Sequence, residues 1–96
     1  MGETPMPRHM HTSHLTLTLY TKPGCHLCEA VEQVIQRVRR DFPFDLIKRN
    51  ILDDPQDQQT YGEQIPVVLL GGREVARYRM TEAQLRAALQ AKWGGV

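Results

Sequence analysis

The sequence predicts an α/β domain in which helices cover a mixed β-sheet, and three observations support this class. Apolar residues alternate with polar ones along residues 15–21 and then recur at helical spacing after residue 24. A second strand-like run follows at 44–51, so the first unit is strand–helix–strand, whose right-handed crossover makes the two strands parallel. A Gly-Gly pair at 71–72 lies between two further runs and indicates an antiparallel hairpin.

The length of the chain allows one small domain, since it has 96 residues. We expect residues 1–14 to form a disordered N-terminal tail, because proline, threonine and histidine dominate there without any periodicity. Residues 15–96 then form a single domain, which we expect to be a monomer.

Charge and hydropathy argue against several function classes. A net charge of +1 gives neither the positive field that attracts nucleic acid nor a polyanionic tail. No apolar run approaches the roughly 20 residues that span a membrane, and the first residues lack the apolar core of a secretory signal. We therefore expect a cytoplasmic, reducing environment, in which two close cysteines are more often catalytic or metal-binding than structural.

The first strand and helix follow from a change of period. Residues 15–21 place Leu15, Leu17 and Leu19 on one face, as in a half-buried strand that ends at Pro23 and Gly24. From there apolar residues recur at steps of three and four, which predicts an amphipathic helix that begins near Cys25 and stops before Pro43. The members of this apolar stripe are Leu27, Val31, Val34, Ile35, Val38 and Phe42.

The middle of the chain predicts a strand and a short helix. Residues 44–51 have the composition of a second strand. Asp54 before Pro55 is a cap and first-turn signal for a helix that runs to about Tyr61, with Gly62 closing it.

The last third predicts the hairpin and a final helix. Residues 66–70 form a buried strand, and the glycines at 71–72 supply the positive φ angles of a two-residue turn. Residues 73–80 are the returning strand, and Thr81 with Gln84 makes a capping box for a helix over 81–93. The residues expected to face inward from that helix or from the strand before it are Met80, Leu85, Ala88 and Leu89, with Trp93 covering an edge.

Both cysteines of the chain, Cys25 and Cys28, lie where the first strand gives way to the first helix. A C-x-x-C at this place in a strand–helix–strand pattern is typical of a thioredoxin-like redox motif. A structural zinc site needs four ligands, and no second ligand pair accompanies this one, so we expect no bound metal. A purely structural bridge is no better supported, because closing so short a loop adds little chain-entropy stabilisation.

Two stretches together resemble a known family. They are LYTKPGCHLC at 19–28 and QIPVVLLGG at 64–72, and they are similar to the glutaredoxin branch of the thioredoxin superfamily, in particular to small bacterial glutaredoxin-like proteins with a C-H-L-C site. The resemblance implies a thioredoxin-like fold of order β-α-β-α-β-β-α. It also implies a cytoplasmic thiol–disulfide oxidoreductase that reduces disulfides through a Cys25/Cys28 dithiol.

The two cysteines are expected to differ in role. At about 100° per residue, Cys28 falls on the edge of the apolar stripe, whereas Cys25 turns towards solvent at the helix start. Free N–H groups there favour a thiolate, so we expect Cys25 to attack and Cys28 to resolve the mixed disulfide. Lys22 and His26 are nearby cations or donors that could act in the same direction, or they could be solvated surface residues.

Ile65 and Pro66 are the remaining candidate site residues. Proline here can simply begin a strand, where its missing N–H does no harm. The resemblance instead implies a cis Ile65–Pro66 bond that faces the cysteines and leaves the Ile65 backbone to pair with an extended peptide or with glutathione.

The sequence departs from its relatives in ways that affect the electron donor. Leu19 stands where thioredoxins carry a buried aspartate, and Ala76 with Arg77 stands where many glutaredoxins have a Gly-Gly pair that helps to hold glutathione. We therefore expect no cofactor beyond the dithiol and regard glutathione as a weakly supported donor beside a reductase of the thioredoxin-reductase type. The expected partners are protein or small-molecule disulfides. The alternative is a non-catalytic redox-sensing or partner-binding module.

Overall fold

A computed structural model of the chain describes residues 15–94, with side chains through residue 91. The predicted tail at 1–14 and the edge-covering role of Trp93 therefore lie outside the described residues. Along the chain the elements are β1 (Thr16–Thr21), α1 (His26–Arg39), β2 (Asp45–Asn50), the 3-10 turn η2 (Ile51–Asp53), α2 (Pro55–Tyr61), β3 (Val67–Leu70), β4 (Arg73–Arg77) and α3 (Glu82–Gly94). This is the predicted order with one short turn added.

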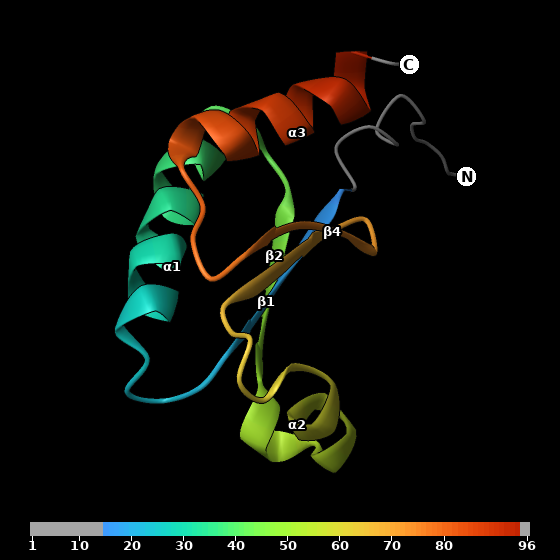
Figure 1. Ribbon diagram of the computed structural model, residues 1–96. Coiled ribbons are helices and arrows are strands. Elements are labelled where there is room, and N and C mark those ends of the chain that lie inside the picture. Colours follow the sequence, from blue (N-terminus) through green and yellow to red (C-terminus); the bar gives the residue numbers. More distant parts are fainter. Residues whose placement is uncertain (1–14, 95–96) are drawn as a thin grey trace, which may run out of the picture.

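The four strands form one mixed sheet in the order β2-β1-β3-β4 (Figure 1). β1 runs parallel to β2 and antiparallel to β3, and β3 pairs with β4 across the turn at Gly71 and Gly72. Both glycines have positive φ, 61° and 84°, as the predicted hairpin turn requires. Within residues 15–94, no helix has the length and apolar character needed to cross a membrane.

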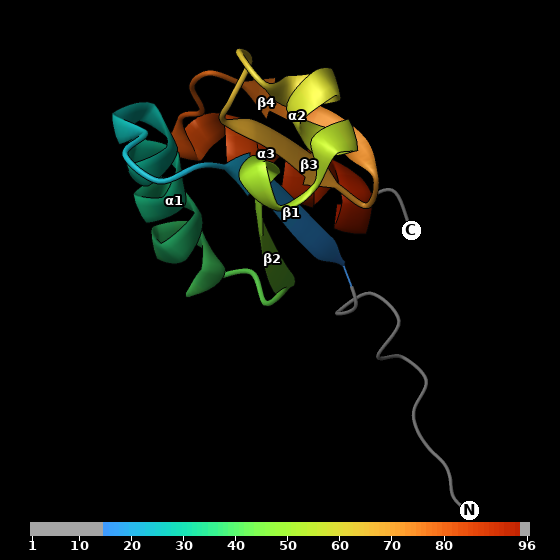
Figure 2. The same ribbon diagram turned by 90° about the horizontal axis from the view of Figure 1, so that it is seen from below.

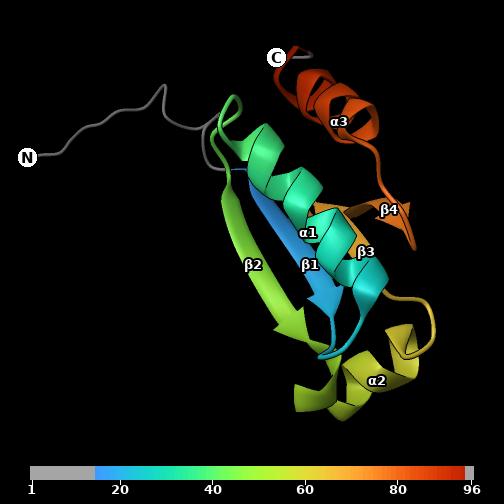
Figure 3. The same ribbon diagram turned by 90° about the vertical axis from the view of Figure 1, so that its left-hand side faces the viewer.

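The main core lies between one face of the sheet and the helices α1 and α3. Figure 3 shows α1 lying across β1 and β2, with α3 beyond it. The side chains that meet there alternate along the strands and follow the helical stripe, as expected. They include Leu17 and Leu19 of β1, Val31, Ile35 and Val38 of α1, and Leu85 and Leu89 of α3.

The opposite face of the sheet is covered only in part. Tyr20 points there, because it alternates with the buried Leu19, and the ring of Tyr61 from α2 stacks on it. Figure 2 shows the molecule from the end at which α2 lies, with α2 in front of the sheet. Ile47 on β2 stays 46% exposed, so the expectation that helices cover the sheet holds fully for one face alone.

Several predicted ends shift by a few residues. The first helix ends at Arg39 and not near Phe42. The second strand stops at Asn50, whose side-chain oxygen accepts a 2.9 Å hydrogen bond from the Leu52 N–H and turns the chain into η2. Gly62 caps α2 as predicted, with a right-handed φ of −43°.

Two corrections matter for the site. The returning strand was expected to reach Met80, but β4 ends at Arg77, because Tyr78 adopts a left-handed φ of 71° and its N–H bonds to the Pro66 carbonyl at 2.7 Å. Met80 still reaches the core, as predicted. Leu27 was placed in the inward stripe and is instead 44% exposed.

The capping box of α3 forms as predicted. The Gln84 N–H donates to Thr81 Oγ1 at 3.1 Å, and Gln84 Oε1 accepts from the Thr81 N–H at 2.9 Å. These two bonds satisfy polar groups that a helix start would otherwise leave without helical partners.

Replacing Thr81 by alanine should lower the free energy of unfolding by about 1 kcal/mol, because the cap is lost. Urea denaturation followed by circular dichroism measures this. Thr60→Ala, an equal change at an exposed position inside α2, is the matched control and should not destabilise. Equal midpoints for the wild type and the Thr81 variant would contradict the importance of the cap.

Candidate functional site

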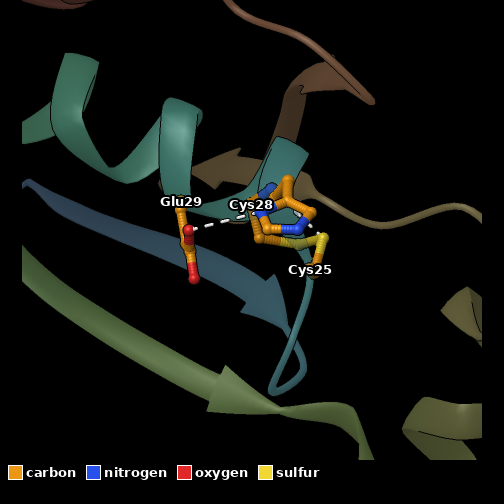
Figure 4. Close-up of a disulfide and its surroundings, with 4 residues drawn as sticks. Cys25, Cys28 and Glu29 are labelled. Atoms are coloured by element: carbon orange, nitrogen blue, oxygen red, sulfur yellow. Dashed lines mark hydrogen bonds and ion pairs between the residues drawn. A yellow bond between two sulfur atoms is a disulfide. The ribbon is translucent and has the colours of Figure 1, made fainter.

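The two cysteines form a disulfide at the start of α1. Cys25 is the N-cap residue, with extended backbone, and its Sγ accepts a 3.1 Å hydrogen bond from the Cys28 N–H. Their Cα atoms lie 5.2 Å apart, inside the range that a disulfide spans. Figure 4 shows the bridge and the N–H···S contact beside Glu29. The first helical turn therefore directs a backbone donor at the outer sulfur.

Burial separates the two sulfur atoms clearly. Cys28 is only 2% exposed and belongs to a small buried cluster with Ile51 and Ile65. Cys25 is partly exposed and packs against the rim of that cluster. The sequence predicted this order from the helical rotation but placed Cys28 half-buried. The extra burial comes from Ile51 and Ile65, which the chain brings in from outside the helix.

Ile65 packs in the same buried cluster as Cys28, and Pro66 follows it in the chain. The Ile65–Pro66 peptide bond is cis. Ile65 belongs to the buried cluster that contains Cys28, and Cys25 packs against the same cluster. Pro66 is fully buried, and its carbonyl accepts the hydrogen bond from Tyr78 that ends β4. This segment therefore joins the redox pair to the chain between β4 and α3.

Lys22 and His26 occupy different surroundings. Lys22 lines a groove of about 410 Å³ that also contains Cys25, so the structure does bring these two residues together. The His26 side chain is 95% exposed, and its Nδ1 lies 3.8 Å from Glu29 Oε1. Lys22 thus lines the groove that contains Cys25, whereas the His26 side chain extends into solvent.

The charges around this groove are of both signs. Sequence reasoning had placed Cys25 in a positive environment. The described groove, which we call the charged groove, contains two ammonium groups and three carboxylates, from Lys22, Lys48, Glu29, Glu32 and Asp53. Lys48 Nζ is already paired with Glu32 Oε1 at 3.1 Å. The backbone donor at the start of α1 is therefore the clear positive influence on Cys25.

An aromatic pair that the sequence did not single out lies on the other side of the cluster. The Tyr20 and Tyr61 rings stack with centroids 4.3 Å apart, and both pack against the cluster of Cys28, Ile51 and Ile65. Tyr20 could have been noticed, because period-two alternation places it opposite Leu19 next to the motif. Tyr61 could not, since only the tertiary contact brings α2 there.

Electrostatics favour the protonated form of the Tyr20 phenol. Burial raises the pKa of Tyr20 above its ordinary value, and the neighbouring Tyr61 and Asp57 raise it further. Arg49 opposes them in part, with its guanidinium 5.8 Å from the Tyr20 ring centroid. Asp57 binds Arg49 Nη2 at 3.1 Å and so raises the pKa of that guanidinium.

Metal ligation finds no support in the described part of the chain. Among residues 15–94, no three side chains of the His, Cys, Asp and Glu types come together as a metal-binding group.

Fold and site together define a class of protein. A four-stranded mixed sheet, a C-x-x-C disulfide at the start of α1 and a cis-proline that follows Ile65 of the cysteine cluster form a thioredoxin-like fold. A mutant thioredoxin from Halobacterium salinarum superposes with a TM-score of 0.64 at 16% identity, over 88% of this chain and 80% of its own. A structure described as a malarial protein does so with a TM-score of 0.65 at 12% identity, over 82% and 97%. Identities this low speak for the fold alone.

The chain belongs to the glutaredoxin-like domain family (DUF836), whose model matches residues 16–90. Uncharacterized proteins of Mycobacterium tuberculosis and Mycobacterium bovis are 30% identical over 74 residues, which is 72% of this chain and 76% of each relative. The X-ray structure of target protein XcR50 from X. campestris is 32% identical with a TM-score of 0.67, over 78% of this chain and 96% of that one. The resemblance noted in the sequence is confirmed.

The raised pKa of Tyr20 gives a prediction about alkaline pH. A tyrosine whose pKa is higher in the folded state keeps its proton longer than in the unfolded chain. The stability it contributes is therefore complete below the ordinary value of about 10 and is lost as the pH rises through the folded value. Absorbance of the phenolate against pH should show a tyrosine that titrates late and disappears in Tyr20→Phe.

Tyr78 is an exposed tyrosine of the same chain, so Tyr78→Phe is the matched control and should leave the late-titrating signal in place. A titration curve that Tyr20→Phe leaves unchanged at its alkaline end would contradict the assignment.

Proposed function

We propose that the protein is a thiol–disulfide oxidoreductase that reduces disulfides through Cys25 and Cys28. One observation carries the proposal above all: an accessible sulfur caps the start of α1 and is bonded to a second sulfur that is 2% exposed. Thiol–disulfide exchange needs this division, with one sulfur open to a partner and another close behind it to resolve the mixed disulfide. Membership of the glutaredoxin-like family supports the same chemistry.

Cys25 is the attacking sulfur in this proposal. A thiolate at the start of α1 faces the Cys28 N–H, which donates to Cys25 Sγ at 3.1 Å in the disulfide form. Unpaired N–H groups and the helix dipole lower the pKa of a thiol at such a position. Cys28 is shielded from solvent, and burial in apolar surroundings favours its protonated thiol until the disulfide forms.

The exchange proceeds in two balanced steps. The Cys25 thiolate attacks one sulfur of the substrate disulfide, a new S–S bond forms, and the other substrate sulfur leaves as a thiolate that takes a proton. Cys28 then loses its proton and attacks Cys25 Sγ, which releases the second substrate sulfur as a thiol. The substrate gains two electrons and two protons, and the Cys25–Cys28 pair becomes the disulfide that the structure contains.

The partners in this proposal are disulfides of proteins or small molecules, and an external dithiol or a reductase returns the pair to its reduced state. In this proposal Lys22 and the Ile65 backbone contact the substrate. Its support is that Lys22 lines the groove that contains Cys25 and that Ile65 belongs to the cluster of Cys28. We place this activity in the cytoplasm, where a reducing pool is available. The competing possibility is a redox-sensing module whose disulfide switches a binding surface, and such a module would react once without turnover.

Serine variants of the two cysteines should behave unequally. With an aromatic disulfide that releases a coloured thiolate, Cys25→Ser should react only at the background rate. Cys28→Ser should release one equivalent and stop as a mixed disulfide on Cys25, which mass spectrometry detects. The wild type with dithiothreitol should turn over many times, and a single turnover would favour the sensing module.

The rate of alkylation by iodoacetamide, measured as a function of pH, provides an independent check of the roles of the two cysteines. Each single-cysteine variant serves as the matched control for the other. The variant that retains Cys25 should react faster at neutral pH, because more of its thiol is ionised. A faster, lower-pKa Cys28 would reverse the assignment.

Glutathione should be a poor donor. Ala76 and Arg77 stand where many glutaredoxins have the glycine pair, and the next residue, Tyr78, presents a side chain in the turn that follows β4. Turnover with glutathione and glutathione reductase should therefore be much slower than with dithiothreitol at equal thiol concentration. Specific, tight glutathione binding by calorimetry would contradict this prediction.

A further inference from the structure

A second groove, apolar in character, is lined in part by Leu27, the residue that precedes Cys28 on α1. It has a volume of about 290 Å³ and lies between α1 and the segment that joins β4 to α3. In Figure 1 that segment runs alongside α1. We call it the Leu27–Tyr78 groove; its lining residues are Leu27, Ala30, Val31, Val34, Tyr78, Arg79, Met80 and Thr81.

The rim of this groove exposes two large side chains while its floor is closed. Leu27 is 44% exposed and Tyr78 is 45% exposed, whereas Val31 and Met80 beneath them belong to the core. Single exposed apolar residues are ordinary on a protein surface. Two that border the same concavity make a surface from which a partner could remove water.

The backbone at Tyr78 is unusual for a tyrosine. Its φ of 71° lies in the left-handed region, which bulky residues rarely adopt because it strains the backbone. The conformation is held by hydrogen bonds on both sides, from the Tyr78 N–H to the Pro66 carbonyl at 2.7 Å and from the Arg79 N–H to the Arg77 carbonyl at 2.8 Å. Glycine would adopt it without strain, but the chain has an aromatic side chain there.

Two of the lining residues, Leu27 and Tyr78, link the groove to the redox centre. Leu27 lies between Cys25 and Cys28 in the chain, and Tyr78 is hydrogen-bonded to Pro66, which follows Ile65 of the cysteine cluster. The charged groove, which contains Cys25, is polar where the Leu27–Tyr78 groove is apolar. A polypeptide that crosses Cys25 therefore meets an apolar surface and a charged one.

We propose that the Leu27–Tyr78 groove receives a large apolar side chain next to the reacting cysteine of an extended protein substrate. This inference rests on the proposed function and names its substrate class. With a volume of about 290 Å³, the groove is at or below the small end of ordinary small-molecule sites, about 300–1,000 Å³, and it suits a single side chain. Leu27 and Tyr78 are specificity-determining residues in this arrangement.

The test compares two peptides that differ only beside their cysteine. Each is unstructured and has its cysteine in a mixed disulfide with a coloured aromatic thiol; leucine flanks the cysteine in one peptide and serine in the other. With dithiothreitol as donor, the wild type should show a kcat/KM about tenfold higher for the leucine peptide. That ratio should fall towards one in Leu27→Ser and in Tyr78→Asn, since asparagine tolerates a left-handed backbone.

Two controls separate docking from folding. Ile47→Ser removes an equally exposed aliphatic side chain from the far face of the sheet and should keep the tenfold ratio. Tyr78→Gly removes the ring where glycine accepts the backbone without strain, so it should keep the melting temperature and still lose the ratio.

The outcomes that overturn the inference differ from those that overturn the function. The proposed role of the groove would be overturned if the wild type had equal kcat/KM for both peptides. It would also be overturned if the ratio of kcat/KM between the peptides stayed unchanged in the variants of Leu27 and Tyr78. A dimer in sedimentation that Tyr78→Asn dissociates would overturn it too, because a second copy would then occupy the groove. No reaction of either peptide with Cys25 would overturn the proposed function itself, and this inference with it.

Discussion

The rotation of α1 about its own axis decides which sulfur a partner can reach. Val31, Ile35 and Val38 are buried against the sheet, and each such side chain contributes about 1.5–3 kcal/mol. Together they are comparable with the whole net stability of a small domain, about 5–15 kcal/mol, so the helix cannot turn to expose another face. Cys28 continues this buried side and goes inward, while Cys25 remains at the cap. The proposed division of roles follows from that packing.

Ion pairs hold the outside of the same helix but contribute less to its position. Arg37 pairs with Glu82 at 3.3 Å, and Arg86 bridges Asp41 at 2.7 Å and Glu82 at 3.1 Å, joining the end of α1 to α3. All of these groups are substantially exposed, and an exposed pair contributes about 0–1 kcal/mol. The apolar contacts between α1, α3 and the sheet therefore dominate, and the ion pairs reinforce an arrangement already set by them.

The surroundings of the redox pair differ from side to side. The stacked rings of Tyr20 and Tyr61 form an aromatic wall against the buried cluster. The charged groove beside Cys25 has nearly balanced charges, and the Leu27–Tyr78 groove is apolar. Because no strong field of one sign surrounds Cys25, contacts to neighbouring side chains should matter more for partner choice than long-range steering.

The sequence by itself determined the order of the elements, the hairpin turn, the capping box and the redox motif, because local periodicity and turn chemistry encode all of them. It also ranked Cys25 above Cys28 in exposure. Only the tertiary structure decided the full burial of Cys28, which depends on Ile51 and Ile65. It also decided where β4 ends, which depends on the hydrogen bond from the Tyr78 N–H to the Pro66 carbonyl. The outward position of Leu27 was decided there too. Contacts between residues distant in the chain leave no periodic signal, so helical spacing alone could not predict them.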